Sequence, residues 1–366
     1  MRVGLYIPGI DKRFIGGPTK YQINLARALA DLNEVELFLL HHRNVDSLNI
    51  KAKHIIISER KPILWEVKLR KCNLDIVHFN LIPTTRRIFF PILNCKKVVT
   101  IHGDLHWIKE PFVDYNRWNY RIRRLVEPWS NKFMDAIITV SNNLRHRLIQ
   151  FLKVTESKIR VIYEGVSSEY KPLKKASHIK EKYRIPRPFI FHLSNLSAKK
   201  NPQTLFKAFS QLLEKDFDLE LVIAGARWSN KLIRSMIEKI DFASNIRILG
   251  YVPEQDLICL YNAAELFFFP SLHETFGFPV LEAMACGTSV VTSNAYSIPE
   301  IAGDAAILCD PHDYQGFAKA IANILKDEEL KERMRMKSLK NAKRFSWEKC
   351  AKETTKIYEQ LLVGRT

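Results

Sequence analysis

The sequence lacks several features that would place it at once in a common class. None of its apolar runs reaches the roughly 18 residues of a transmembrane helix, and the chain enters a strand-like run at residues 3–7 without the leader of a secretory signal peptide. Its six cysteines form no Cys-x-x-Cys pair and no zinc-ligand spacing. It has no internal repeat and no low-complexity tract. We therefore expect reduced thiols and a cytoplasmic protein.

Acidic residues are scarce in the first half of the chain. Residues 1–180 hold 32 Lys and Arg against 16 Asp and Glu, whereas the remaining residues hold 25 against 23. The net charge of +18 therefore comes almost wholly from the first half. Such an asymmetry indicates an anionic partner for that half.

Strand-like and helical patterns alternate along the 366 residues, which are enough for two domains with buried cores. A first array of strand-like runs comprises residues 3–8, 35–40, 54–57, 75–79, 97–102, 136–140 and 159–163. After a polar, linker-like segment at 171–178, a second array comprises residues 189–193, 219–224, 246–249, 265–269, 289–292 and 305–308. The pattern predicts an α/β protein of two doubly wound, Rossmann-like parallel sheets, in residues 1–176 and 177–346. Its ligands would bind at the carboxyl ends of the strands, in a cleft between the two domains.

The stretch 270–287 has the composition of a phosphate site. The apolar run Leu266–Phe269 ends at a proline, a glycine loop follows, and Pro279 lies where the first turn of a helix tolerates proline. A strand, a glycine loop and a helix N-terminus leave several backbone N–H groups pointing at one place, which binds phosphate. Glu274 and Glu282 flank that place. Because a carboxylate is favourable there only if hydroxyls donate to it, we interpret both as sugar or ribose ligands, with Glu282 on the ribose.

The two glutamates, with seven residues between them, lie inside ETFGFPVLEAMACGTSVVTSN, and Ser297-Ile-Pro-Glu300 follows. This stretch resembles the donor-site signature of the retaining GT-B glycosyltransferases of family 4. The alternative is an ordinary strand–helix junction with two solvated glutamates. The resemblance covers essentially the whole chain. It implies an enzyme that moves a hexose, such as mannose or glucose, from a nucleotide-sugar donor to a glycan or lipid-linked acceptor in cell-surface polysaccharide or lipopolysaccharide synthesis. It also implies that the last helix, in residues 347–366, completes the first domain.

In the second domain, the resemblance implies a set of donor-binding residues: Lys199, Lys200, Thr275, Phe276, Gly277 and Glu282. The two lysines precede Asn201 as a basic pair precedes asparagine in the family. They would neutralise the donor diphosphate, whose charge grows as the glycosidic bond breaks. A solvated basic turn is the alternative.

In the first domain, Gly16 and Gly17 precede a helix and would let a substrate approach the backbone closely. They look like the glycine pair that family members use near the acceptor and the donor phosphate, although a plain tight turn would also explain them. No Walker A loop is completed here. His102, at a strand end, matches the family's histidine beside the sugar, and we predict that it is catalytic together with Glu274. His78, also at a strand end, is an acceptor-side candidate or is satisfied by its own neighbours.

We expect a reaction without a cofactor or a metal ion, because, apart from one D-x-D motif, no cluster of residues has metal-ligand spacing. Asp216-Phe217-Asp218 is a D-x-D motif, which binds a metal in another glycosyltransferase fold, but it precedes a strand in a polar turn away from the expected cleft. The family's mechanism would be front-face attack, with the leaving diphosphate as the base and the enzyme positioning the reactants. Glu164 stands where family members often carry asparagine, and we assign no role to it.

The acceptor side is predicted from the basic first half. Residues 117–129 place apolar side chains on one helical face with arginines around it, and Arg121 and Arg124 are acceptor-side candidates. Arginine beside tryptophan is typical of a segment at an anionic membrane surface, but the face would equally pack on its own sheet. We expect an anionic, lipid-linked glycan acceptor and no nucleic acid. The protein would be free in the cytoplasm or peripheral at the inner face of the membrane.

Two other functions remain open from the sequence. A nucleotide-sugar 2-epimerase would use the same fold but no acceptor. A non-enzymatic basic protein would bind nucleic acid or a membrane with a steep salt dependence and would be indifferent to nucleotide sugars.

Overall fold

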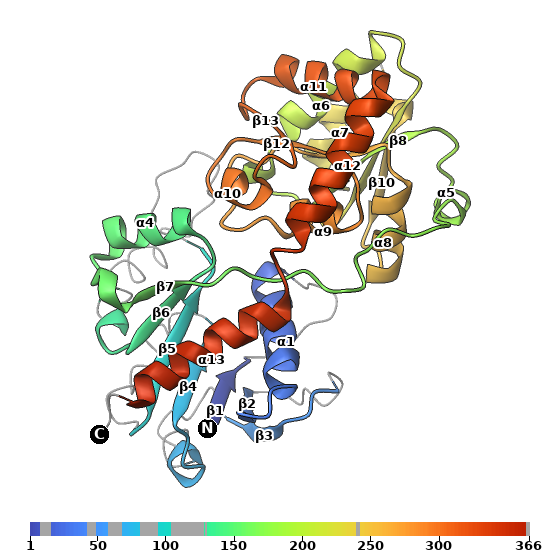
Figure 1. Cartoon of the computed structure of the whole chain (residues 1–366). Helices are drawn as coiled ribbons and strands as arrows, with labels where there is room; N and C mark the ends of the chain where they lie inside the picture. Colours follow the sequence, from blue (N-terminus) through green and yellow to red (C-terminus); the bar gives the residue numbers. More distant parts are fainter. Residues whose placement is uncertain are drawn as a thin grey trace. The chain divides into compact units, whose positions relative to one another are not determined.

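The computed structural model describes residues 1–7, 16–41, 49–57, 68–80, 94–103, 128, 130–238 and 242–363. The chain divides into two compact units (Figure 1). The first unit comprises Met1–Gly165 and Phe345–Thr366, and the second comprises Val166–Arg344. Each unit is built around its own parallel sheet.

The sheet of the first unit has, within the described residues, the strand order β3-β2-β1-β4-β5-β6-β7. Its strands are β1 (Arg2–Tyr6), β2 (Glu36–His41), β3 (Lys53–Ile56), β4 (Ile76–Phe79), β5 (Lys96–Ile101), β6 (Ala136–Thr139) and β7 (Ile159–Val161). The helices in the described part of this unit are α1 (Gly17–Ala30), α4 (Asn142–Leu152) and α13 (Trp347–Val363), with a short 3-10 turn η4 (Glu156–Lys158). Helix α13 packs against α1 (Figure 1), where the Trp347 and Tyr21 ring centroids lie 5.9 Å apart. The last helix of the chain therefore shares the core of the first unit.

The sheet of the second unit has the strand order β10-β9-β8-β11-β12-β13. Its strands are β8 (Phe189–Leu193), β9 (Glu220–Ala224), β10 (Ile246–Gly250), β11 (Leu266–Phe269), β12 (Val290–Ser293) and β13 (Ile307–Cys309). The helices are α5 (His178–Lys182), α6 (Pro202–Leu213), α7 (Lys231–Ile237), α8 (Glu254–Ala263), α9 (Phe278–Ala285), α10 (Ile298–Ala302), α11 (Tyr314–Lys326) and α12 (Glu328–Ala342), with 3-10 turns η5 (Ala198–Lys200) and η6 (Ala243–Asn245). Helices α6 and α11 pack together over the sheet in one apolar core.

The predicted fold class is confirmed. All thirteen strands that the sequence predicts are present, and their ends lie within two residues of the predicted ones. Every pair of neighbouring strands among the described residues is parallel. The apolar runs made this possible, because a strand covered by helices on both faces is largely apolar, as the fully buried β11 is at all of its positions.

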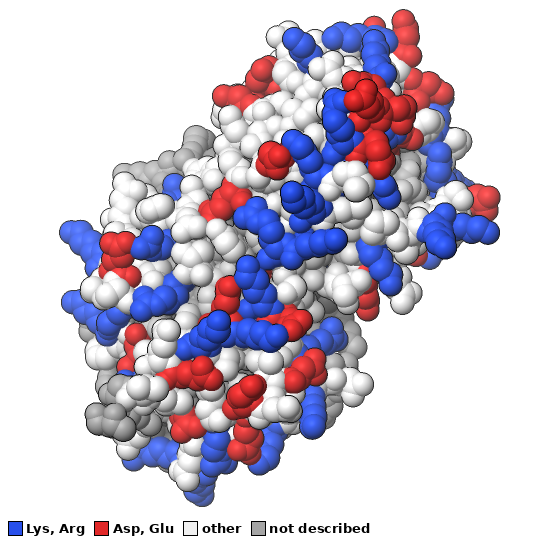
Figure 2. Space-filling view, in the orientation of Figure 1, with Lys and Arg blue, Asp and Glu red and all other residues white. Residues whose placement is uncertain are grey.

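Charges of both signs lie on the surface. Figure 2 shows Lys and Arg interspersed with Asp and Glu over the drawn face. On α12 and α13, neighbouring charges form ion pairs, such as Arg335–Glu332 and Lys352–Glu348. Among the described residues, no helix has both the length and the hydropathy that crossing a membrane requires.

Candidate functional site

The loop between β11 and α9 carries most of the predicted donor residues. Strand β11 is buried from end to end and the chain leaves the sheet at Pro270. Helix α9 follows Gly277, whose φ of 104° lies in the left-handed region, and has Pro279 in its first turn. A Cβ built on Gly277 would lie 2.7 Å from Ile298 Cδ1. The backbone conformation therefore favours glycine at 277, whereas the contact alone would require only that the end of the Ile298 side chain move.

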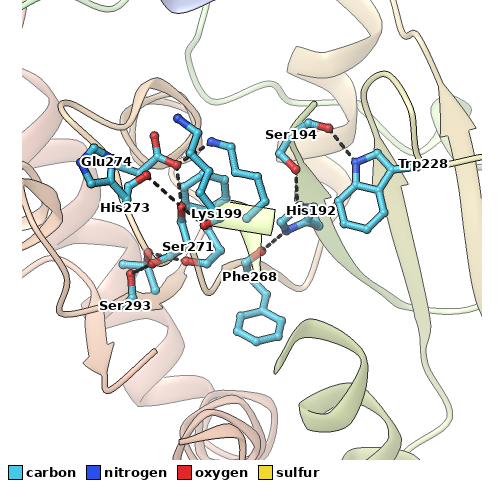
Figure 3. A network of polar contacts seen from close by, with 12 residues as sticks. His192, Ser194, Lys199, Trp228, Phe268, Ser271, His273, Glu274 and Ser293 are labelled. Carbon is cyan, nitrogen blue, oxygen red and sulfur yellow. Dashed lines mark hydrogen bonds and ion pairs between the residues drawn. The ribbon is translucent and has the colours of Figure 1, made fainter. Parts of the chain in front are cut away.

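A buried ion pair lies at the carboxyl ends of β8 and β11. Lys200 Nζ lies 2.5 Å from Glu274 Oε1, and the Ser271 hydroxyl lies 2.7 Å from the same oxygen (Figure 3). The side chains of Lys200 and Glu274 are 12% and 10% exposed. Lys200 Nζ also lies 4.9 Å from the centroid of the Phe269 ring, a cation–π contact. Two donors thus hold the Glu274 carboxylate in one orientation.

The charges of this cluster set its protonation. Burial by itself would raise the pKa of Glu274, but the charges of Lys200 and Lys199, with hydrogen bonds from Lys200 and Ser271, lower that pKa to about 2. Burial lowers the pKa of the Lys200 ammonium, and Glu274 opposes that shift. The Glu274 carboxylate is therefore ionised at neutral pH.

Main-chain bonds tie the loop of the basic pair to the loop of Glu274. The Leu272 N–H donates to the Lys199 carbonyl at 2.7 Å, and the Ser293 hydroxyl, at the end of β12, donates to the Ser271 carbonyl at 2.6 Å (Figure 3). The loops that follow β8, β11 and β12 are thus held against one another. The structure brings the predicted Lys199, Lys200 and Glu274 to one place.

Glu282 lies farther along α9 and is 2% exposed. The Tyr261 hydroxyl, from α8, donates to Glu282 Oε2 at 3.1 Å. Between the two glutamates, Phe276 is buried against Phe278, with ring centroids 5.3 Å apart, and Thr275 is half-buried. Glu282 therefore lies in the same segment as the loop but faces a phenol in the interior of the unit.

The sequence reasoning assigned no role to Ser271, His273 or Ser293. The His273 ring lies against Tyr296, with centroids 4.1 Å apart. The contact of Ser271 could have been predicted from the sequence, because a hydroxyl just after a strand end hydrogen-bonds to nearby groups in its own loop. The contact of Ser293 could not have been predicted, because it depends on β12 lying beside β11.

A second polar network holds the start of the loop that carries the basic pair Lys199 and Lys200. His192 Nδ1 lies 2.9 Å from the Phe268 carbonyl oxygen and Nε2 lies 2.8 Å from Ser194 Oγ. Because a carbonyl only accepts, Nδ1 carries the proton and the Ser194 hydroxyl donates to Nε2. The Trp228 indole N–H donates to the Ser194 carbonyl at 2.7 Å (Figure 3). Burial lowers the pKa of His192 to about 4, so the ring is neutral and the network is fixed at neutral pH.

In the first unit, His102 follows β5 and has a carboxylate partner. His102 Nδ1 lies 3.1 Å from Glu164 Oε1, and the two side chains are 7% and 3% exposed. The Tyr21 ring of α1 meets the His102 ring edge-on, with centroids 4.5 Å apart. The predicted catalytic histidine is thus held by a residue to which the sequence assigned no role.

His78, an acceptor-side candidate, is fully buried. Its Nδ1 lies 2.5 Å from the Tyr358 hydroxyl of α13, and its Nε2 lies 2.7 Å from the Thr100 hydroxyl, which also lies 3.0 Å from the Tyr21 hydroxyl. Burial, together with the charge of His102, lowers the pKa of His78 to about 3. This geometry fits the alternative that neighbours satisfy His78, and contact with an acceptor stays a prediction.

The remaining candidates of the first unit differ in what the structure describes. Gly16 is the N-cap of α1 in an extended conformation, Gly17 is the first helical residue, and a Cβ on Gly16 would meet only Pro18 Cδ, at 4.0 Å. The glycine at position 16 therefore leaves open space beside the backbone, and the extended backbone there does not itself require glycine. Arg121 and Arg124 lie outside the described residues.

The D-x-D motif lies in a polar turn before β9. Asp218 is exposed and pairs with Arg187 at 2.9 Å, and Asp216 has a positive φ of 61°. Within the described ranges, no group of three or more His, Cys, Asp and Glu side chains is placed to hold a metal ion.

Comparison with known proteins places these features in a family. Residues 15–170 match the model of Glycosyltransferase Family 4, and residues 174–341 match the model of Glycosyl transferases group 1. The chain is 34% identical over 246 residues to O-antigen chain mannosyltransferase B of Escherichia coli, covering 65% of this chain and 65% of that protein. It is 30% identical over 236 residues to the serotype-specific mannosyltransferase WbdA of the same species, covering 62% of this chain and 29% of the relative. These matches span less than two thirds of the length of either relative.

A solved structure shows the same fold over nearly the whole chain. Sucrose-phosphate synthase from Thermosynechococcus elongatus matches with a TM-score of 0.81 at 18% identity, over 99% of each chain. The two family models together match almost all of residues 15–341. The chain therefore belongs to the glycosyl transferases of group 1, with a first half of the Glycosyltransferase Family 4 type.

Proposed function

We propose that the chain is a nucleotide-sugar-dependent hexosyltransferase, which moves a mannose or a similar hexose to a glycan acceptor in cell-surface polysaccharide synthesis. The observation that carries this proposal is the cluster of Lys199, Lys200, Ser271 and Glu274 at the carboxyl ends of β8 and β11. It combines positive charge with an oriented carboxylate, which suits a sugar joined to a diphosphate. The mannosyltransferase names of the Escherichia coli relatives support mannose as the sugar.

In the proposed donor complex, the diphosphate lies against Lys199, Lys200 and the N-terminus of α9, beside residues 275–277. Lys200 then shares its charge between Glu274 and the phosphate oxygens. The Glu274 carboxylate, already oriented, accepts hydrogen bonds from hydroxyls of the transferred sugar. Glu282 accepts from the ribose hydroxyls.

The proposed reaction retains the configuration of the transferred sugar and needs no metal ion. Negative charge grows on the diphosphate as the glycosidic bond breaks, and Lys199 and Lys200 stabilise that charge in place of a metal. His102 would bond to the sugar, and Gly16 and Gly17 would let the substrates approach the backbone. The contribution of the protein is then positioning and charge stabilisation.

We also propose an anionic, lipid-linked acceptor bound by the first unit, at the inner face of the cell membrane. The excess of 32 basic over 16 acidic residues in residues 1–180 supports an anionic partner. The O-antigen relative supports a cell-surface glycan.

A panel of nucleotides and nucleotide sugars tests the donor. A ligand that binds only the folded state stabilises it by about 2.7 kcal/mol at a hundred times its Kd, so the true donor should raise the melting temperature by several degrees. Mannose and glucose donors of uridine and guanosine diphosphate are the first candidates. If no member of the panel raises the melting temperature, the proposed function is wrong.

Product analysis then tests the reaction. With donor and a mannose-terminated acceptor, nuclear magnetic resonance should show a new glycoside with the anomeric configuration of the donor, and chelating agents should leave the rate unchanged. An epimerised sugar from donor alone would identify a 2-epimerase instead. An inverted product would refute the retaining mechanism.

Sedimentation with vesicles tests the membrane contact separately. The proposal predicts binding that increases with the content of anionic lipid and weakens with salt. A protein that stays in the supernatant at every lipid composition would require a soluble acceptor.

A further inference from the structure

Glu164 is a buried carboxylate that the proposed reaction does not yet use. It follows β7, in the loop that leads out of the first unit, and is 2% exposed. His102 follows β5, and β6 separates these two strands in the sheet. The two loops nevertheless converge, so that Glu164 Oε1 lies 3.1 Å from His102 Nδ1. A carboxylate taken out of water is costly unless a partner compensates it, and His102 is such a partner for Glu164.

The groups around the pair are neutral at physiological pH. Burial lowers the pKa of His78 to about 3. Burial raises the pKa of Tyr21 and Tyr358, from α1 and α13, and also that of the Cys350 thiol of α13. The described titratable groups that face the pair therefore carry no charge that would compete with the Glu164–His102 contact.

We propose that Glu164 is a positioning residue for His102: it accepts the Nδ1 proton and thereby fixes both the tautomer and the orientation of the ring. An ionised carboxylate only accepts hydrogen bonds, so the proton lies on Nδ1, and in the neutral ring Nε2 carries the lone pair. The Tyr21 ring, whose centroid lies 4.5 Å from that of the imidazole in an edge-on contact, also limits rotation of the imidazole. An asparagine at position 164 would offer an amide oxygen without charge, so this chain holds its histidine electrostatically as well as by geometry.

The consequence for the reaction rests on the proposed function. With Nδ1 committed to Glu164, a hydroxyl of the sugar donates to Nε2 of the neutral ring. The negative carboxylate also stabilises the protonated imidazolium relative to the neutral ring. A protonated ring no longer accepts from the hydroxyl, so we expect turnover to fall in acid.

Nitrogen NMR of the full chain, labelled at histidine, tests the pair without any substrate. The His102 signals are identified by their loss in His102→Gln. In the wild type we expect the proton on Nδ1, and in Glu164→Gln we expect the pKa of His102 to fall by roughly 1–3 units, the size of the effect of one nearby opposite charge. Glu359→Gln, which removes an exposed carboxylate of α13, is the matched control and should leave His102 unchanged.

Two outcomes would overturn the proposal. A proton on Nε2, with Glu164 protonated and donating to Nδ1, would reverse the roles of the pair; burial does raise the pKa of Glu164, against the opposing hydrogen bond and charge of His102. A His102 pKa that is the same in wild type and Glu164→Gln would mean that the contact is only structural. The wild-type measurement does not need Glu164→Gln, so it decides the tautomer even if that variant folds poorly.

Kinetics with the identified donor give the functional readout. In Glu164→Gln the acid limb of the kcat/KM profile should move to lower pH by the same amount as the NMR pKa, while Glu359→Gln keeps the wild-type profile. A shifted NMR pKa with an unshifted acid limb would overturn the step at His102 but leave the contact standing. If no transfer is detected with any donor, the proposed function fails while the NMR result still decides the role of Glu164.

Discussion

Lys200→Met removes the cation that compensates the buried Glu274 carboxylate and keeps a side chain of similar length. In the wild type, Lys200 Nζ lies 2.5 Å from Glu274 Oε1, and the two side chains are 12% and 10% exposed. Removing one partner of a buried pair costs about 3–5 kcal/mol, because the remaining charge is left uncompensated. Since both side chains keep some contact with water, we expect the free energy of unfolding of the second unit to fall by about 3 kcal/mol at neutral pH.

The effect of Glu274 on stability should change sign with this substitution. In the wild type its pKa of about 2 lies below the ordinary value of 4.5, so the carboxylate stabilises the fold above that value and the contribution is lost as the pH falls toward 2. In Lys200→Met burial dominates and raises the pKa, so ionised Glu274 destabilises the folded state until acid protonates it. The stability difference between the two proteins should therefore shrink as the pH is lowered from neutral toward about 4.

Trp228 provides a probe for the measurement, because it is the only tryptophan between residues 166 and 344 and is fully buried. Fluorine NMR of fluorotryptophan-labelled protein would follow urea unfolding of the second unit at several pH values. Lys215→Met, at an exposed lysine, is the matched control, and adding Glu274→Gln to Lys200→Met should recover part of the loss. A loss below about 1 kcal/mol, the range of exposed pairs, would refute the reasoning, as would a loss that grows in acid.

Three further predictions concern the close packing around Gly165, the binding of the donor ribose and the binding of the donor diphosphate. A Cβ on Gly165 would lie 2.3 Å from the Trp347 backbone nitrogen, so Gly165→Ala should destabilise the first unit by about 1–3 kcal/mol, and an unchanged melting temperature would contradict this close approach. Glu282→Ala should weaken donor binding by roughly 1–3 kcal/mol in titration calorimetry, and an unchanged Kd would end the ribose assignment. Replacing Lys199 and Lys200 together by alanine should weaken binding of a nucleoside diphosphate far more than of the free nucleoside, whereas equal weakening would mean that the pair is structural.

Both sheets could be predicted from the sequence because each buried parallel strand is a short apolar run. Leu266–Phe269, buried at every position, is the clearest example. The order of the strands could not be predicted. In the first sheet β1 lies between β2 and β4, and in the second β8 lies between β9 and β11. The position of each strand in the sheet depends on how the helices and loops that connect the strands pack. The apolar runs themselves contain no information on that packing.

The residue types of the site could therefore be predicted from the sequence, but which side chains pair with one another could not. Lys200 and Glu274 are 74 residues apart and meet because β8 and β11 are neighbours. Glu164 reaches His102 across an intervening strand, which no local pattern records. The position of His78 at a strand end could be predicted, but its partner on α13, the Tyr358 hydroxyl, comes 280 residues later in the chain.

The two buried glutamates differ in pKa because their partners differ. Glu274 faces two ammonium groups, whose charges outweigh the effect of burial and lower its pKa to about 2. Glu164 faces one imidazole, whose hydrogen bond and charge oppose burial without overcoming it, so its pKa is raised. As the pH falls from neutral, the Glu164–His102 pair therefore takes up a proton before Glu274 does. Acid should accordingly impair the first unit before it alters the donor cluster of the second, and turnover should decline at a higher pH than donor affinity.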